Sequence, residues 1–306
     1  MIDFRALVYS SMKQTKTVGY FLLAVSLIAF SGPAWSEVNG ASGALRQEYL
    51  SMVSALQNSP LKRAVMLESV DHEGQLGANL SGVLEKSLAD VASVAKSPQH
   101  WCEIILLLSN TKACKVVGTQ SVPTLQVTAG TGKSADTTGA NTSAFKFAII
   151  EQGQDYLDIA LVAPQGPMGL SDIQLAFQAV SLGDQKSYLR MRYSYHANWF
   201  GRMTMQVYLQ TLGRGKVGFS KAPSSQSSTN WIEGPRSVIE RNTMRYFLGL
   251  ECALQDGAPE MVGRFYRLAE CWYSAVEQYP IQLHEMTRSE YLQMKASEFQ
   301  QSSAEH

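Results

Sequence analysis

The sequence predicts an α+β fold in which a curved antiparallel β-sheet is gripped by a long helix, with additional C-terminal helices. Three observations indicate this fold. Four successive segments alternate apolar and polar residues, short connections join them, and helical spacing dominates after residue 199. Alternation with period two gives each strand one dry side, and short connections join antiparallel neighbours. A single sheet with one apolar face needs a helical cover.

Each element follows from a local pattern. The apolar positions of the four alternating strands are Phe145, Phe147 and Ile149; Leu157, Ile159, Leu161 and Ala163; Ile173, Leu175, Phe177 and Ala179; and Leu189, Met191, Tyr193 and Tyr195. Upstream, a turn at residues 71–74 predicts a hairpin of strands 64–69 and 76–84. Two short helices follow near residues 87–96 and 97–108, and then short strands near 115–118 and 124–128.

The second half of the chain is expected to be mainly helical. Helical spacing predicts a helix over residues 199–212 and another over 235–254, and either can cover the sheet. Two further helices are expected over residues 260–279 and 282–299, with Pro280 as a break between them. We therefore expect a helical extension beyond the sheet domain.

The N-terminal segment indicates export. Basic residues at 13 and 16 precede an apolar run at 18–30 and small residues at 34 and 36, as in a signal peptide. The run is short for a bilayer span. We expect cleavage between Ser36 and Glu37, a periplasmic or secreted protein and no stable transmembrane anchor after cleavage. An uncleaved anchor is the alternative, and translation from the second methionine is also possible.

These features divide the 306 residues into four parts. They are a signal peptide (1–36), an N-terminal helical segment (37–60), the sheet domain (61–254) and a C-terminal helical extension (255–306). The chain has 26 basic and 26 acidic residues, of which the leader holds three and one, so the remainder has 23 and 25. A nearly neutral balance argues against nucleic acid as a partner.

Four cysteines remain after the leader: Cys102, Cys114, Cys252 and Cys271. In an oxidising compartment an even number of cysteines indicates disulfides, and four allow three pairings. We favour Cys102–Cys114 and Cys252–Cys271, because each pair lies within one local unit. The chain has no Cys-x-x-Cys and no histidine at ligand spacing from a cysteine, so we expect no metal site and no cofactor.

The stretch from Leu88 to Trp101, Leu-Ala-Asp-Val-Ala-Ser-Val-Ala-Lys-Ser-Pro-Gln-His-Trp, resembles the START-like (helix-grip) lipid-transfer superfamily. There, a similar helix leads into a second helix at the open end of the sheet. The loop at residues 166–172 before a strand is also similar, and the resemblance covers about residues 64–254. It implies a cavity between sheet and helix that holds a lipid-like hydrophobic ligand.

The resemblance and the alternation together suggest a ligand-binding interior. Its candidate lining residues are Trp101, Phe147, Ile159, Phe177, Met191, Tyr193, Tyr195, Trp199 and Met203. Ordinary core packing is the alternative for each of them. Arg241 and Arg245 share a face of one expected helix and are candidates to bind a carboxylate or phosphate headgroup, unless they form a solvated flank.

Two other functions stay open. His196, beside Tyr193 and Tyr195, could act as a general acid or base in a hydrolase or cyclase, although no acidic residue lies near it in sequence. No nucleophile motif supports this, so no catalytic residue is assigned. Alternatively, the protein could be an envelope assembly factor that binds a protein partner through the aromatic residues of its last helices: Trp272, Tyr273, Tyr279, Tyr291 and Phe299.

Overall fold

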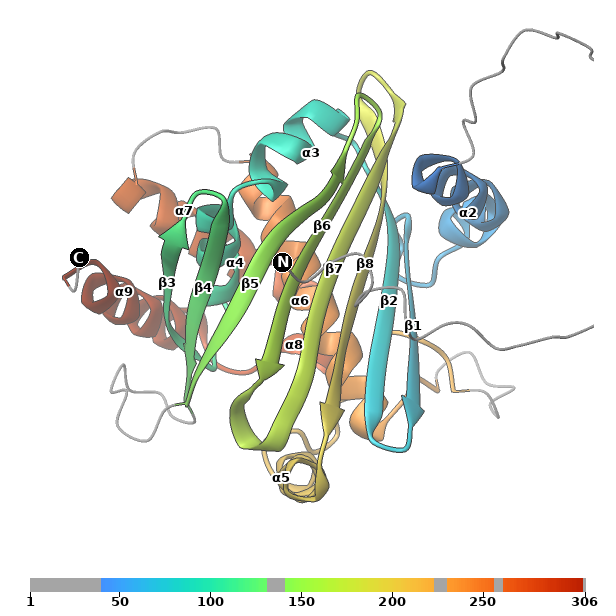
Figure 1. Ribbon diagram of the computed structural model, residues 1–306. Helices are drawn as coiled ribbons and strands as arrows, with labels where there is room; N and C mark the ends of the chain where they lie inside the picture. The colour runs from blue at the N-terminus through green and yellow to red at the C-terminus, as the bar shows by residue number, and fades with distance from the viewer. Residues whose placement is uncertain (1–39, 131–140, 223–229, 256–260, 305–306) are drawn as a thin grey trace, which may run out of the picture.

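The structure is a computed structural model that describes residues 40–130, 141–222, 230–255 and 261–304. The expected leader lies outside these residues. Within them the chain forms one eight-stranded antiparallel sheet that curves around a long helix (Figure 1). The predicted α+β fold is therefore confirmed. No helix within the described ranges is both long enough and apolar enough to cross a membrane.

The sheet has the order β1-β2-β8-β7-β6-β5-β4-β3. Its strands are β1 (Val65–His72), β2 (Gln75–Leu84), β3 (Thr111–Thr119), β4 (Val122–Ala129), β5 (Asn141–Gln152), β6 (Tyr156–Gln165), β7 (Leu170–Gly183) and β8 (Lys186–Ala197). Strands β3 to β8 form the predicted meander. The N-terminal hairpin extends this meander because β2 pairs with β8 along its whole length.

The turn between β1 and β2 explains why β1 is longer than expected. Glu73 and Gly74 both have positive φ angles, 52° and 89°, as a two-residue hairpin loop of type I′ requires. Such a tight loop lets the two strands pair up to the last residue before it, and His72 pairs with Gln75. Strand β1 thus continues three residues past the predicted end at Ser69.

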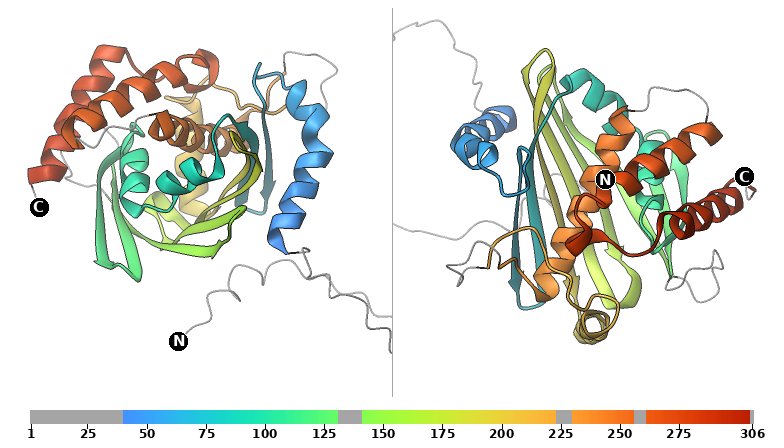
Figure 2. Two further views of the ribbon diagram at one scale, coloured as in Figure 1. Left: turned by 90° about the horizontal axis from the view of Figure 1, so that it is seen from above. Right: turned by 180° about the vertical axis from the view of Figure 1, so that it is seen from behind.

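The helices occupy distinct sides of this sheet (Figure 2). They are α2 (Ala41–Gln57), α3 (Leu88–Ala95), α4 (Pro98–Leu106), α5 (Trp199–Gln210), α6 (Gly234–Gln255), α7 (Met261–Val276), α8 (Pro280–Leu283) and α9 (Arg288–Ala304), with a 3-10 turn η1 (Pro167–Gly169). Helix α6 lies across the concave face, so it is the gripping helix and α5 is not. Helix α2 packs on the outer face, while α3 and α5 lie at opposite ends of the sheet.

Helices α3 and α4 close one end of the interior. The Ser97 side chain caps α4, as its position before Pro98 predicts. The indole nitrogen of Trp101 donates a 2.7 Å hydrogen bond to the carbonyl of Ala95, which joins the two helices. A Cys102–Cys114 disulfide then ties α4 to β3.

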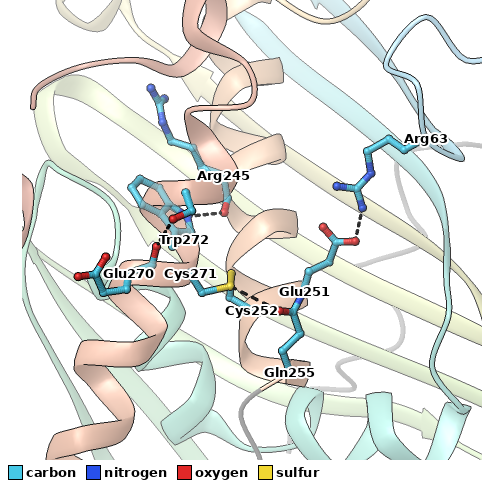
Figure 3. Close-up of a disulfide and its surroundings, with 9 residues drawn as sticks. Arg63, Arg245, Glu251, Cys252, Gln255, Glu270, Cys271 and Trp272 are labelled. Atoms are coloured by element: carbon cyan, nitrogen blue, oxygen red, sulfur yellow. Dashed lines mark hydrogen bonds and ion pairs between the residues drawn. A yellow bond between two sulfur atoms is a disulfide. The ribbon is translucent and has the colours of Figure 1, made fainter. Parts of the chain in front are cut away.

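Of the C-terminal helices, α7 packs on α6, and α9 packs on α7 and on β3. The second disulfide, Cys252–Cys271, links α6 to α7, and the Trp272 indole donates to the carbonyl of Arg245 over 3.1 Å (Figure 3). Both predicted disulfide pairings are therefore confirmed. Trp272 is only 3% exposed, so it serves the core.

The last helix was expected over residues 282–299, and its predicted start is wrong. Helix α8 ends at Leu283, and α9 begins at Arg288. The side chain of Thr287 accepts from the amide of Glu290, whose carboxylate accepts from the amide of Thr287 over 2.9 Å. This reciprocal capping box fixes a new helix start. Pro280 accordingly opens α8.

Three buried charged residues fix α9 against the sheet edge, and we call them the paired cluster: Lys112, Lys295 and Glu298. The Glu298 carboxylate receives the Lys112 ammonium at 2.9 Å and the Lys295 ammonium at 2.6 Å. Lys295 also donates to the carbonyls of Leu108 and Thr111, at 2.6 and 3.0 Å. All three donor positions of its ammonium are thus used.

Candidate functional site

The space between the sheet and α6 is lined mainly by the residues that alternation pointed inward. Seven of the predicted lining residues are at most 8% exposed and belong to one hydrophobic cluster: Trp101, Phe147, Ile159, Phe177, Met191, Tyr193 and Tyr195. Trp101 meets Phe177 edge to face, with ring centroids 6.2 Å apart. The side chains pack against one another, and their contact with a ligand stays a prediction.

The interior becomes more polar along β8. Met191 lies level with Leu80 and Phe177 in the apolar part. Two residues further along the strand, Tyr193 packs edge-on against Tyr246 of α6, at 5.4 Å between centroids, and against Tyr195 at 5.6 Å. Burial raises the pKa of Tyr246 to about 12, so its hydroxyl stays protonated and can donate. The tyrosines thus form the boundary between apolar and charged regions.

Arg241 lies at the polar end of this interior, on α6. Its side chain is 0% exposed. The Nε group donates to the carbonyl of Ser237 over 3.2 Å, but Nη1 and Nη2 have no hydrogen-bond partner. The guanidinium lies over the ring of Tyr208 on α5, 5.6 Å from its centroid. Burial lowers the pKa of Arg241, and the neighbouring Tyr208 opposes this shift.

Two more cations and one carboxylate surround Arg241. Arg245 donates to Glu285 over 2.6 Å and to Asn242 over 3.1 Å, and the Lys216 ammonium is 3.8 Å from Glu285. We call Lys216, Arg241, Arg245 and Glu285 the open cluster. Lys216 and Arg245 share the Glu285 carboxylate, and Arg241 has two donors without a hydrogen-bond partner. The arrangement therefore has room in charge and in hydrogen bonding for an anion.

The electrostatics of the open cluster follow from burial and from the excess of cations. Burial lowers the pKa of Lys216 to about 8, with Glu285 opposing and the two arginines adding to the shift. Burial alone would raise the pKa of Glu285, but Arg245, Ser109 and Lys216 hold it below its usual value. Glu285 is thus ionised, and Lys216 loses its proton at mildly alkaline pH.

Several of these residues were not identified from the sequence. Lys216 lies between the two helices expected at residues 199–212 and 235–254, and Glu285 is 40 residues from Arg245 in the chain. Tyr208 and Tyr246 lie in the helices expected at residues 199–212 and 235–254, but no pattern marked them as site residues. The spacing of Arg241 and Arg245 was the one usable indication, since residues four apart lie on one helix face.

Trp199 and Met203 do not line the interior, contrary to the expectation. They are 70% and 40% exposed, on the outer side of α5. The expectation failed because helical periodicity identifies an apolar face but not its neighbour. The inner side of α5 instead carries Gly201, whose Cα lies so close to η1 that an added Cβ would meet the Gly169 carbonyl oxygen at 3.1 Å.

His196 is also exposed, at the end of β8. Its neighbours Tyr193 and Tyr195 point into the interior, so alternation directs the histidine to the opposite side. It does not line either pocket described below. An acid–base role inside the fold therefore has no support from its position.

Two pockets lie elsewhere in the described part of the chain. A groove of about 670 Å³ runs between the start of β1, the end of β2 and the last turn of α6, and the Arg63–Glu251 ion pair crosses it (Figure 3). A shallower one of about 500 Å³ lies between α7 and α9, beside Tyr266 and Leu292. Neither is lined by the open cluster.

The strand order, the paired short helices and the gripping α6 define a START-like helix-grip fold, so the predicted fold is confirmed. A scan against family models and a search of curated proteins give no match. Similar solved structures include human StAR-related lipid transfer protein 5, which is 9% identical with a TM-score of 0.36 over 70% of this chain and 94% of that one.

Two others are norcoclaurine synthase from Thalictrum flavum, 11% identical with a TM-score of 0.31 over 61% and 89% of the two chains, and an aromatase/cyclase from Streptomyces sp. R1128. The latter is 7% identical, with a TM-score of 0.31 over 69% and 96%. These similarities concern the fold alone. The function is therefore argued from the geometry of this chain.

Proposed function

We propose that this protein binds an amphipathic, lipid-like anion. Its carboxylate or phosphate meets the open cluster, and its apolar part lies between α6 and the sheet. The observation that supports this most is the buried guanidinium of Arg241 with two unused donors. Leaving charged donors unpaired in the interior is costly, and an anionic ligand would satisfy both through a bidentate contact.

The polarity of the interior supports one orientation of the ligand. Along β8 the inward side chains change from Met191 to Tyr193 and Tyr195, and Arg241 follows beside them. A ligand with its tail toward Trp101 and its headgroup at Arg241 matches this order. Each buried methylene contributes about 0.8 kcal/mol, so a medium-length acyl chain suffices for micromolar affinity.

Entry of the ligand is proposed to require displacement of α5. Gly201 is the one buried residue of this helix, so few apolar contacts hold it in place. Its Tyr208 covers Arg241. Moving α5 aside would expose the open cluster and the polar end of the interior together, whereas α3 and α4 close the other end.

A binding experiment with matched probes tests this proposal. We expect the purified protein to bind a fluorescent fatty acid and, less tightly, its methyl ester. Arg241→Met should weaken binding of the acid about 10- to 100-fold, because a charge-assisted contact contributes about 1.5–3 kcal/mol, and should barely affect the ester. Arg264→Met, which removes a cation of α7 near Glu103, is the control. Equal losses for acid and ester, or no binding of either, would contradict the proposal.

We also propose that the protein acts outside the cytosol. Both disulfides use all four cysteines, and the apolar run at residues 18–30 has the features of a signal peptide. The mass of the protein recovered from a cell envelope fraction tests this. We expect a chain that begins at Glu37 and has no free thiol, whereas an intact leader or four thiols would argue against it.

A further inference from the structure

Helix α5 presents its apolar side to the solvent. The exposed fractions are 70% for Trp199, 49% for Phe200, 40% for Met203 and 55% for Val207, and Leu212 just beyond the helix is 80% exposed. An α-helix turns by about 100° per residue, so the four helical positions lie within about a third of the helix circumference. The opposite side carries Gly201 and Tyr208, which contact the rest of the protein. Met205 also packs on the core, so the exposed apolar side is a second one, turned outward.

The position of α5 gives this surface a convex shape. The helix lies at the extreme end of the molecule, beyond the strand ends and opposite α3 (Figures 1 and 2). Neither described pocket includes any of its residues. A projecting helix without a groove suits a flat partner better than an inserted peptide or helix.

The charges around α5 indicate the chemistry of that partner. Residues 185–232 contain no aspartate or glutamate. Arg202 on α5 and Arg214, four residues after its end, are both exposed. Acidic residues near this end of the molecule lie outside α5, with Asp71 and Glu73 on the β1–β2 hairpin and Asp172 on β7. An apolar side with Trp and Phe, accompanied by exposed arginines, is typical of helices that lie in a membrane interface.

We infer that the outer side of α5 docks on the surface of a bilayer that contains anionic lipids. Trp199, Phe200, Met203, Val207 and Leu212 enter the interface, while Arg202 and Arg214 lie at the level of the phosphates. The bilayer thereby removes from water an apolar surface that no described part of the chain covers. This inference does not rest on the proposed ligand, because Arg241 is not part of the docking surface.

Flotation of the full-length protein with lipid vesicles tests the inference. We expect binding to vesicles of phosphatidylcholine with phosphatidylglycerol, and weaker binding to phosphatidylcholine alone. Trp199→Gln together with Leu212→Gln should lower the partition coefficient at least about tenfold, because two large apolar side chains no longer leave water. The control replaces Val122 and Ile281 by Gln, since these are 59% and 63% exposed on other elements, and should bind like the parent.

Two further measurements separate the contribution of the arginines from that of Trp199. Arg202→Gln with Arg214→Gln should remove most of the preference for phosphatidylglycerol, because each cation near an anionic surface contributes about 1 kcal/mol. Trp199→Phe should still float with vesicles but lose the blue shift of tryptophan emission that the parent shows on binding.

Several outcomes would overturn the inference. One is equal flotation of the parent and the Trp199/Leu212 variant. Because both proteins have the same N-terminus, that segment would not account for a difference between them. Another is absence of flotation with either vesicle type. A third is a parent dimer that dissociates in that variant, which would identify a second copy of the chain as the partner. A double variant that fails to float yet binds the fluorescent fatty acid like the parent would support docking independently of ligand binding.

Discussion

The protein contains two buried groups of basic residues, and they differ in how completely their donors are used. In the paired cluster, Lys295 makes three contacts with oxygen acceptors and shares Glu298 with Lys112. In the open cluster, Lys216 and Arg245 share Glu285, and two nitrogens of Arg241 have no hydrogen-bond partner. The three residues of the paired cluster are 0–2% exposed, and Arg241 and Arg245 are 0% and 5% exposed, whereas Lys216 and Glu285 are more accessible to solvent.

The difference separates a structural role from a binding role. A buried cation with all donors satisfied holds two elements together, as Lys295 joins α9 to the end of α4 and the start of β3. A buried cation with unused donors weakens the fold unless something else supplies acceptors. The open cluster is therefore the better candidate for a ligand-binding site. The paired cluster is the structural group with which its stability and binding are compared.

The largest expected effect comes from breaking the paired cluster. Glu298→Gln would remove the carboxylate charge that the buried Lys112 and Lys295 share, and should lower the free energy of unfolding by about 3–5 kcal/mol. Urea denaturation followed by circular dichroism measures this. Glu270→Gln, which affects a half-exposed pair with Arg288, should cost no more than about 1 kcal/mol. Similar midpoints for the two variants would remove the distinction.

The next effect concerns the disulfide beside the paired cluster. Replacing Cys102 and Cys114 by Ala should lower the free energy of unfolding by about 3 kcal/mol, because the bond restricts the unfolded chain. Affinity for the fluorescent fatty acid should not change, since the bond joins α4 to β3, away from Arg241. Chemical denaturation and a binding titration on the same sample check both parts. A large loss of affinity would show that the two regions are coupled.

A smaller effect is expected from the pH dependence of the open cluster. Lys216 has a pKa of about 8 in the folded protein, so it is charged at pH 7 and mostly neutral at pH 9. Affinity for the fatty acid, whose carboxylate is ionised throughout, should fall by up to about tenfold over this range. Lys216→Met should bind more weakly at pH 7 and lose this pH dependence. The methyl ester is the control and should bind equally at both pH values.

The smallest expected change in the free energy of unfolding is that of an Arg241 variant, and it tests the difference between the two clusters most directly. Arg241→Met should leave the free energy of unfolding unchanged to within about 1 kcal/mol, or raise it, because the guanidinium leaves two donors unsatisfied in the ligand-free protein. Its loss of fatty-acid affinity should still be large. A drop in stability comparable to that of Glu298→Gln would instead assign Arg241 to the framework of the fold.

Much of the fold could be predicted because its determinants are local. Alternation identified β5 to β8, the Ser97-Pro98 pair marked the start of α4, and both disulfides joined cysteines close in the chain. The start of α9 was missed because helical spacing is insensitive to a capping box at Thr287.

The candidate site was predictable only in part. Arg241 and Arg245 are on one helix, and their spacing was sufficient to place them together. Lys216, Tyr208 and Glu285 come from a loop, a different helix and the segment after α8, and no sequence pattern links them. Their meeting depends on how α5 and the C-terminal helices pack around α6.

By itself, the sequence determined which segments have one apolar side, because that property repeats with the period of the strand or helix. The tertiary structure decided which of those sides are covered, because coverage depends on neighbours distant in the chain. Helices α5 and α6 show the two outcomes. Both carry apolar residues and arginines, but α6 is enclosed by the sheet and α7, whereas α5 lies beyond the strand ends with its apolar side in water.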